Sequence, residues 1–255
     1  MQSKKQKEEK KRKKEKTYSP GFSANVETMD FPTGIDISVV HRISDMKEEP
    51  KFIRDFRLRA LKYWEKSREP SWHNLDIRPI DYQNILCYSA PKNNADGPKS
   101  IEDADPEILR TFERLGIPLQ EQKRLLGIAI DAVFDSVSVG ITNSKILKES
   151  GVIFCSMSEA IKKYPKLVAK YLGSVVPYKD NFFAALNSAV FADGSFVYIP
   201  QGVECPLDIS TYFRINDINI GQFERTLIIA DKGSFVNYLE GCTAPQRKEH
   251  QLHAA

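Results

Sequence analysis

The last third of the chain contains short β-rich runs that follow one another too closely for helices to lie between them. After Ala192 these runs cover 196–199, 209–215, 226–230 and 235–239, and glycine, aspartate and asparagine punctuate them. A parallel βαβ unit needs a crossover of a dozen or more residues, which these spacings do not provide. The segment 194–197 recurs as 233–236, an offset of 39 residues, and such repetition indicates stacked strands. The pattern favours a β-helix or solenoid, with a β-sandwich as the structural alternative.

Upstream of these runs, apolar residues recur at helical spacing. In 50–68 the aromatic and apolar residues line one face, and in 119–137 a similar stripe runs from Leu119 to Phe134. Residues 156–159 form a capping box, the usual start of a helix. The prolines and polar residues between 71 and 104 indicate a loop. We therefore expect helices at 34–46, 50–68, 105–114, 119–137, directly after Ser156, and at 181–190.

The charge of the chain is concentrated in a lysine-rich N-terminal tail. Residues 4–16 hold nine cations and three glutamates, a net charge of +6, which leaves −3 for the rest of a chain whose total is +3. With almost nothing apolar to bury, residues 1–20 are expected to be disordered. The remainder has no basic excess, so we expect no nucleic-acid partner. No apolar run approaches the ~20 residues of a membrane span, and the tail resembles neither a signal nor a transit peptide. We expect no membrane partner and a cytoplasmic location, with a plastid as the alternative.

The four cysteines, at positions 87, 155, 205 and 242, are widely spaced and form no Cys-x-x-Cys pair, so we expect reduced thiols. Cys242 stands out because Glu240-Gly-Cys-Thr-Ala-Pro245 places it after an apolar run, on a turn-like backbone. A single cysteine in such a context is more often a small buried hydrophobe than a reactive thiol. His250 and His253 lie nearby, but a zinc site needs four ligands and only three candidates occur here. We expect no metal site.

Several longer motifs identify a family resemblance. They occupy 173–188 (GSVVPYKDNFFAALNS), 198–202 (YIPQG), 210–216 (STYFRIN), 221–226 (GQFERT), 240–245 (EGCTAP) and 251–255 (QLHAA). In this order they closely resemble the SufB/SufD family, the scaffold proteins of the SUF system for iron–sulfur cluster assembly, and the SufB branch more than the SufD branch. The similarity runs from about Gly21 to the end and covers roughly the N-terminal half of such a protein.

The resemblance implies an α+β fold. Residues 1–20 would be the disordered tail, 21–172 a mainly helical region with a loop near 71–104, and 173–255 the first rungs of a right-handed parallel β-helix, here truncated. Because the last strand would then lack a neighbour, we expect an open sheet edge at the end of the chain.

The resemblance also assigns roles to three residues. Cys242 matches the family's entry point for sulfane sulfur, delivered as a persulfide by a carrier. Arg214 and Asn216 match polar residues that line a path from this cysteine through the interior of the β-helix. We expect Arg214 to project into the same interior as Cys242 and to offset the charge of Glu240. An alternative reading of Arg214 and Asn216 is a polar ladder that fixes the strand register.

Partners and cofactors follow from the resemblance alone. The family implies a SufC ATPase, SufD or a second SufB, and a cysteine desulfurase with a SufE- or SufU-type carrier. The iron–sulfur cluster belongs to the full-length protein, and we expect this chain not to hold it, because the cluster ligands and the SufC-docking helices lie beyond the matched half. A reduced flavin is possible at the level of the complex. The chain is not expected to be an enzyme. The alternatives are a truncated, non-catalytic interaction module, or the first segment of a split or interrupted SufB.

Overall fold

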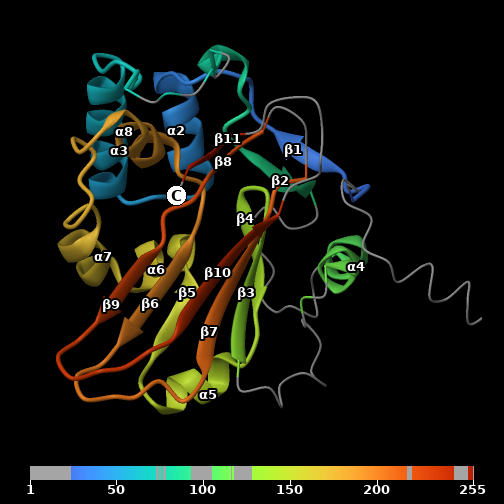
Figure 1. The fold of residues 1–255 in the computed structure, drawn as a ribbon, viewed down its shortest axis with the longest axis vertical. Coiled ribbons are helices and arrows are strands. Elements are labelled where there is room, and N and C mark those ends of the chain that lie inside the picture. The colour runs from blue at the N-terminus through green and yellow to red at the C-terminus, as the bar shows by residue number, and fades with distance from the viewer. Residues whose placement is uncertain are drawn as a thin grey trace, which may run out of the picture.

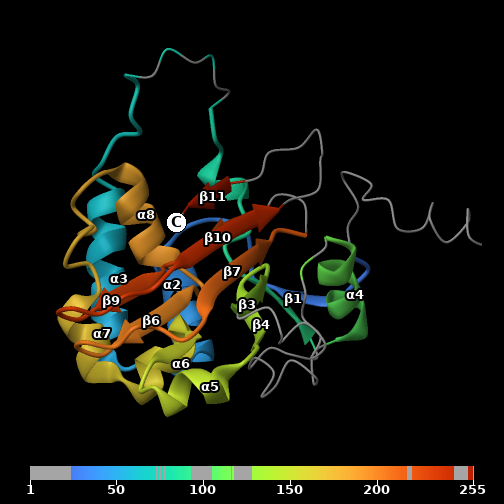
Figure 2. The same cartoon turned by 60° about the horizontal axis from the view of Figure 1, so that its bottom comes forward.

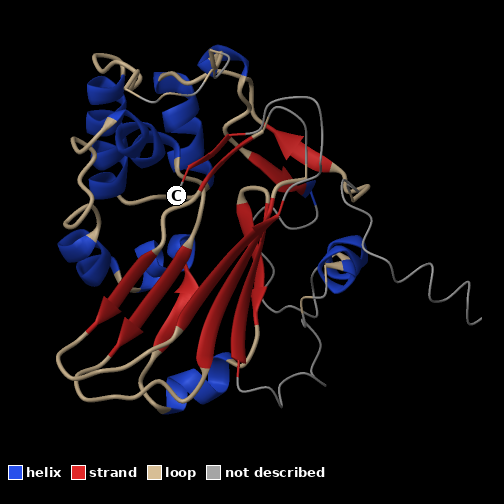
Figure 3. Ribbon diagram, viewed as in Figure 1, coloured by secondary structure: helices blue, strands red, loops and turns tan. Residues whose placement is uncertain are grey.

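The computed structural model describes residues 24–72, 74, 76, 79–92, 105–115, 117, 128–216, 220–243 and 252–254 (Figure 1). The predicted tail at 1–20 and the part of the predicted 71–104 loop that spans 93–104 lie outside these residues. The described chain is α+β, with most helices gathered at one end and along one side of the strands (Figure 3). In order, the elements are β1 (Thr28–Asp30), α2 (Ile37–Met46), α3 (Lys51–Trp64), η1 (Tyr82–Asn84), β2 (Ser89–Pro91), α4 (Pro106–Arg114), β3 (Ile128–Phe134), β4 (Val137–Ile141), α5 (Ser144–Glu149), β5 (Ile153–Ser156), α6 (Met157–Lys163), α7 (Pro165–Tyr171), α8 (Phe182–Val190), β6 (Ser195–Ile199), β7 (Asp208–Arg214), β8 (Gly221–Phe223), β9 (Leu227–Ala230), β10 (Tyr238–Thr243) and β11 (Leu252–Ala254).

Side-chain caps fix where several helices begin. The Asp36 carboxylate accepts from the Val39 backbone N–H at 2.9 Å and starts α2. The Ser156 hydroxyl accepts from the Glu159 N–H at 3.1 Å, which is one half of the predicted capping box and starts α6. Asn181 caps α8 in the same way. Each cap satisfies an N–H that the helix itself leaves without an acceptor.

The predicted helix at 119–137 is wrong over the part that the structure describes. Residues 128–134 form strand β3, which pairs with β7 on one side and β4 on the other, while 118–127 lie outside the described residues. All but the first residue of β3 are buried. A strand buried on both faces shows a continuous apolar run, which also satisfies the helical spacing that the prediction used.

The largest sheet has the strand order β10-β7-β3-β4, and a second has the order β5-β6-β9. Figures 1 and 2 show them side by side, with α4 beside the first and the helices α2, α3 and α8 beyond the end of both. One face of β3 packs against Ile108 and Phe112 of α4. The other face packs against Val197 and Ile199 of β6. The space between the two sheets is therefore an interior lined by β3, β6 and β7.

Three parallel pairings stack the C-terminal strands in two similar sets. β6 pairs with β9, β7 with β10 and β8 with β11, so the second set repeats the order of the first. Register partners such as Phe196 and Leu227, Ile209 and Tyr238, and Gly221 and Leu252 lie about 30 positions apart in sequence. The predicted strands and their stacking are thus present. None of the sheets closes on itself within the described residues, and the right-handed β-helix stays a prediction.

The repeated segment 194–197 and 233–236 is not the structural repeat. Phe196 lies in β6 and pairs with Leu227, whereas Phe235 bridges to Glu204 outside the named strands. The fourth β-rich run begins as a strand only at Tyr238, three residues later than the prediction. The offset of 39 residues therefore joins positions that do not stack, and the spacing set by strand pairing is near 30.

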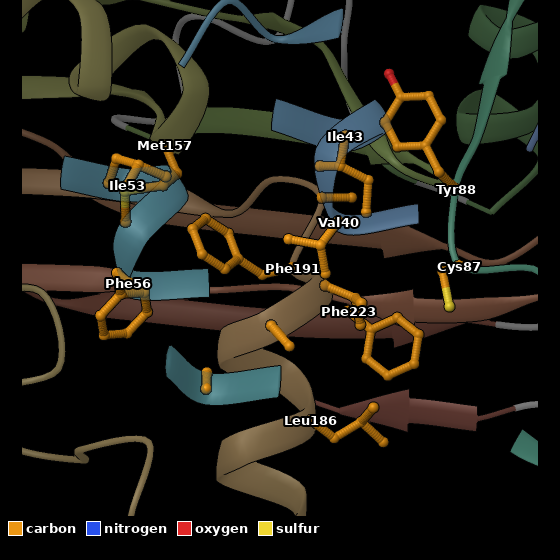
Figure 4. Packing of buried hydrophobic residues seen from close by; sticks show 14 of the residues in the cluster. Val40, Ile43, Ile53, Phe56, Cys87, Tyr88, Met157, Leu186, Phe191 and Phe223 are labelled. Carbon is orange, nitrogen blue, oxygen red and sulfur yellow. The ribbon is translucent and has the colours of Figure 1, made fainter. Parts of the chain in front are cut away.

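The helices share one apolar core with the N-terminal end of the strands. Figure 4 shows Phe191 between Val40 and Phe56, with Leu186 and Phe223 beside them. A buried ion pair lies within this core, where the Arg57 guanidinium donates to Glu49 at 2.6 and 2.8 Å and covers the Phe191 ring at 3.8 Å. The core holds α3 and α8 against β6 and so fixes the position of the stacked strands.

Candidate functional site

Cys242 lies within a strand. The sequence predicted a turn, but β10 continues through Gly241 and Cys242 to Thr243, in register with β7. A Cβ atom at Gly241 would lie 3.0 Å from the Tyr212 ring, so glycine lets that ring pack under the strand. β10 is at the edge of its sheet, and Cys242 is exposed. The thiol is thus held on a regular strand and remains accessible.

Gln222 is a polar partner of this thiol. The Cys242 Sγ donates to Gln222 Oε1 at 4.0 Å, a long sulfur hydrogen bond. Gln222 is 2% exposed and its Nε2 donates to the Asp135 carbonyl at 2.8 Å. That second bond fixes which end of the amide faces Cys242. The sequence reading overlooked Gln222, although a glutamine in the middle of the buried strand β8 was a usable signal.

Arg214 is buried but faces away from the Cys242 side of the sheet. The register pairs Cys242 with Phe213 and Arg214 with Thr243. Because neighbouring residues of a strand project to opposite faces, Arg214 and Cys242 lie on opposite faces. Arg214 is also paired with Phe134 of β3 and is 1% exposed. The expectation that both side chains project into one interior does not match this register.

Asn216 holds the N-terminal segment of the described chain. Its Oδ1 accepts from the Ala24 N–H at 2.7 Å, and its Nδ2 donates to the Ala24 carbonyl at 3.1 Å. Its own N–H donates to the Asp135 carboxylate at 2.7 Å. These contacts give Asn216 an anchoring role that the sequence analysis did not predict. Its roles in a polar ladder and in a sulfur path both stay predictions.

A chain of hydrogen bonds crosses the interior on the Cys242 side. Tyr238, Glu240 and Cys242 alternate along β10 and therefore share a face. The Tyr238 hydroxyl lies 3.1 Å from the Glu240 carboxylate and 3.0 Å from the Thr211 hydroxyl. Thr211 is 2.7 Å from the Ser195 hydroxyl, which lies 3.2 Å from Asp131. The chain thus joins the strand of the exposed cysteine to a fully buried carboxyl.

Asp131 was also overlooked in the sequence, although it is the one charged residue in the run Ile128-Ala-Ile-Asp-Ala-Val-Phe134. Burial raises the pKa of Asp131 to about 7, and hydrogen bonds from Ser138 and Ser195 only partly oppose that rise. Burial likewise raises the pKa of Tyr238. Asp131 therefore changes its charge near neutral pH.

The other three cysteines are less suited to nucleophilic chemistry. Cys87 and Cys155 are buried, and burial raises the pKa of Cys87 to about 12 and that of Cys155 further. Cys205 is half-buried, and burial raises its pKa as well. Since the thiolate is the nucleophile, these three thiols react slowly at neutral pH.

The described residues contain no group of three or more histidine, cysteine, aspartate and glutamate side chains placed to hold a metal ion. His250 lies outside the described residues, and His253 belongs to β11. Among the described helices, none has both the length and the apolar character needed to cross a membrane.

Comparison with known proteins decides the family. The family described as the SufBD protein N-terminal region matches residues 126–211, which include β3, β6 and most of β7. A SufBD family protein for iron–sulfur cluster assembly from Synechocystis is 59% identical over 238 residues, 93% of this chain and 50% of that protein. The chain belongs to the SufBD family.

More distant SufBD relatives match the same share of the chain. The chloroplastic Arabidopsis protein ABCI8 is 52% identical over 92% of this chain and 42% of its own length. A Staphylococcus epidermidis member is 44% identical over 93% of this chain and 50% of its own length. All three relatives are named for iron–sulfur cluster assembly. The chain spans about half the length of the curated relatives it matches.

Proposed function

We propose that this chain is the sulfur-accepting, N-terminal part of an iron–sulfur cluster assembly scaffold, and that Cys242 is the residue that takes up sulfane sulfur. The observation that carries the proposal is that Cys242 is the one exposed thiol among the four cysteines of the chain. It stands on an edge strand, where a carrier protein can reach it. The relatives of the chain are named for iron–sulfur cluster assembly, a process that requires a supply of sulfur.

In the transfer step the Cys242 thiolate attacks the outer sulfur of a carrier persulfide. The new bond joins the Cys242 Sγ to that sulfur, and the old sulfur–sulfur bond breaks, so the carrier leaves as a thiolate. No oxidant or reductant is needed, because the sulfane sulfur keeps its oxidation state. Gln222 Oε1, held in place by its bond to the Asp135 carbonyl, orients the Cys242 side chain for this approach.

The stacked strands are the scaffold on which the thiol is held. The pairs β6–β9, β7–β10 and β8–β11 form the first two coils of a right-handed parallel β-helix in this proposal. The cluster ligands and the helices that dock SufC lie in the part of the relatives that this chain does not cover. Cluster formation and any bound reduced flavin then belong to the complete assembly.

The proposed partners supply the catalytic steps. A cysteine desulfurase with a SufE- or SufU-type carrier delivers the sulfur, a SufC ATPase hydrolyses ATP, and SufD or a second SufB pairs with the scaffold. The chain itself is a sulfur acceptor and no enzyme in this scheme. Its compartment is the cytoplasm or a plastid, and the chloroplastic relative makes the plastid a substantive alternative.

Sulfur transfer from a persulfidated SufE- or SufU-type carrier tests the proposal. The chain is mixed anaerobically with the loaded carrier, and protein-bound sulfane sulfur is measured after the two are separated. Cys242→Ser should abolish the transfer, while the matched variant Cys205→Ser should retain it. Equal transfer to both variants would reject Cys242 as the acceptor.

Reconstitution with iron and sulfide tests the second part of the proposal. We expect no stable cluster on the isolated chain, because its cluster ligands are supplied by sequence outside the matched half. A visible-range absorbance that survives desalting would contradict this.

A second candidate function is a non-catalytic interaction module. Three exposed apolar residues favour it: Ile228 on β9 and Leu239 on β10, and Phe235 between these two strands, all 41–58% exposed. An interaction module would bind its partner equally well with Cys242→Ser and would show no sulfur uptake in the wild-type chain.

A further inference from the structure

The segment that precedes β1 is fastened to the fold at the end of β7. Ala24 donates its N–H to Asn216 Oδ1 at 2.7 Å, and its carbonyl accepts from Asn216 Nδ2 at 3.1 Å. Ala24 is buried, and it belongs to the apolar cluster that includes Ile108 and Phe112 of α4. Residues 1–23 lie outside the described residues, but in any conformation they join the fold at Ala24.

The strand register places this anchor close to Cys242. Cys242 is paired with Phe213, and Asn216 follows that partner by three residues. The pairing continues to Ile215, whose N–H donates to the Thr243 carbonyl at 2.9 Å. Three residues of a strand span about 10 Å, and neighbouring strands are about 5 Å apart. The N-terminal segment therefore joins the fold within roughly 15–20 Å of the thiol.

The chain that leads to this anchor carries a dense positive charge. Residues 4–16 hold nine cations and three glutamates, a net charge of +6, and residues 17–23 hold no charged side chain. Six of the nine cations lie between Lys10 and Lys16, which are fourteen and eight residues before Ala24. Because a chain spans at most about 3.6 Å per residue, Lys16 stays within about 30 Å of the anchor and Lys10 within about 50 Å.

The strand of Cys242 lacks a cation of its own. Glu240 is exposed and lies two residues from Cys242 on the same face of β10. Among the ion pairs of the described residues, none includes Glu240. Arg214, which the sequence predicted to offset this charge, lies on the opposite face. A thiolate and a deprotonated persulfide are both anions, so a negative surface opposes their approach.

We propose that the lysine-rich segment 4–16, tethered beside Cys242 through Ala24 and Asn216, supplies the positive potential that the strand lacks and draws a sulfur carrier with an acidic surface to the thiol. The proposal rests on the function proposed above, in which Cys242 accepts the sulfur. Attraction of this kind raises the rate of encounter. It fades with salt, because the Debye length falls from about 10 Å at about 0.1 M to about 3 Å at about 1 M.

Two disulfide reagents of different charge measure the potential at Cys242 in the whole chain. The dianion 5,5′-dithiobis(2-nitrobenzoate) and the uncharged 4,4′-dithiodipyridine both react with thiolates, so the ratio of their rate constants does not depend on the amount of thiolate. Cys205→Ser removes the half-buried thiol from every chain. In the neutral-tail variant, glutamine replaces six cations, which brings residues 4–16 from +6 to zero: Lys10, Lys11, Arg12, Lys13, Lys14 and Lys16.

The expected change follows from the charge of the reagent. A potential of about one kT at the thiol changes the rate constant of a dianion about seven-fold. The ratio of the dianion to the uncharged reagent should therefore be about five- to ten-fold lower in the neutral-tail variant at about 0.1 M salt, and the two chains should converge at about 1 M. An unchanged ratio at the lower salt would overturn the proposal.

A thiol at the opposite end of the sheet is the matched control. α5 begins beside the first residue of β3, since Asn143 donates to the Ile128 carbonyl at 2.8 Å. β3 runs parallel to the seven residues of β7, so α5 lies about 20 Å from the end that holds the segment (Figure 1). Glu149→Cys, made in chains without the two accessible thiols, should show less than about a two-fold change in the ratio. An equal fall at both thiols would contradict a local effect at Cys242.

Transfer from the loaded SufE- or SufU-type carrier tests the partner. The second-order rate constant should be several-fold lower for the neutral-tail variant at about 0.1 M salt and equal to that of the wild-type tail at about 1 M. Equal rate constants at the lower salt would reject recruitment of the carrier. Tail-dependent binding of polyuridylate, together with unchanged Cys242 rates, would assign the cations to RNA and would also overturn the proposal.

The reagent measurement involves no sulfur carrier, so it separates the two proposals. If Cys242→Ser still accepts sulfur, the proposed function fails while the reagent ratios keep their meaning. If Cys242→Ser blocks transfer and the reagent ratios are the same in both tails, only the role of the lysine-rich segment fails.

Discussion

Replacement of Asp131 by asparagine should change how the stability of the fold depends on pH. Asparagine has nearly the same shape as aspartic acid. Its Oδ1 can accept from Ser138, and its Nδ2 can donate to the Ser195 oxygen, so it mimics the protonated carboxyl without being able to ionise. A comparison of the variant with wild type therefore measures how much the buried charge of Asp131 lowers the free energy of unfolding.

The sign and size of the effect follow from the raised pKa. The pKa of Asp131 is about 7 in the folded chain against an ordinary value of 3.8. The folded state therefore binds more protons than the unfolded state between these values, and its stability falls as the pH rises through that window. Between about pH 5 and about pH 8 the loss of stability amounts to about 2.6 kcal/mol in wild type, most of it below about pH 7.

The measurement is urea unfolding of both proteins at about pH 5 and about pH 8, with Asp30→Asn as a control for an exposed aspartate. The difference in unfolding free energy, Asp131→Asn minus wild type, should grow by about 2.6 kcal/mol from the lower to the higher pH. The difference in unfolding free energy between Asp30→Asn and wild type should be the same at both pH values. A difference for Asp131→Asn that is independent of pH, or that shrinks as pH rises, would refute the reasoning.

Three further predictions concern the frame around the site. Arg57→Ala leaves a buried carboxylate without its cation and should cost about 3–5 kcal/mol in urea unfolding, whereas Arg54→Ala, in an exposed pair, should cost far less. Gly194→Ala places a Cβ on neighbouring backbone at φ +152° and should lower the melting temperature by many degrees, while Gly202→Ala, which meets the strain of φ +73° but no clash, should lower it less. Asn216→Ala removes two buried hydrogen bonds and should cost about 1–3 kcal/mol, with faster hydrogen exchange and proteolysis at the N-terminal segment it anchors; an unchanged exchange rate there would contradict the anchoring role.

Local signals were sufficient for the helices α2, α3, α4, α6 and α8. Caps such as Asp36, Ser156 and Asn181 act within three residues of themselves, so their helices could be predicted from sequence. The β-rich runs near β6, β7 and β9 were also visible, because their residues suit strands regardless of partner. β3 was missed because its apolar residues are buried on both faces, and periodicity cannot separate such a strand from a buried helix.

The candidate site was predicted only in part, because its residues come from distant positions in the sequence. The motif around Cys242 pointed to the thiol itself, but its neighbours come from distant positions. Gln222 is 20 residues from Cys242 in sequence, and Asp131 is 64 residues from Ser195. Which of these side chains meet depends on the register between stacked strands. The repeat at an offset of 39 residues did not predict that register, because Phe196 pairs with Leu227. The face on which Arg214 lies depends on the same register.

The central claim is that Cys242 is the thiol that receives sulfane sulfur, and site-resolved mass spectrometry tests it most directly. The wild-type chain is exposed anaerobically to a persulfidated carrier, the thiols are blocked, and each cysteine-containing peptide is examined for the mass of one added sulfur atom. The account predicts the added sulfur on the Cys242 peptide, with the peptides of the buried Cys87 and Cys155 unmodified. Added sulfur on Cys205 in preference to Cys242, or on none of the four, would contradict it.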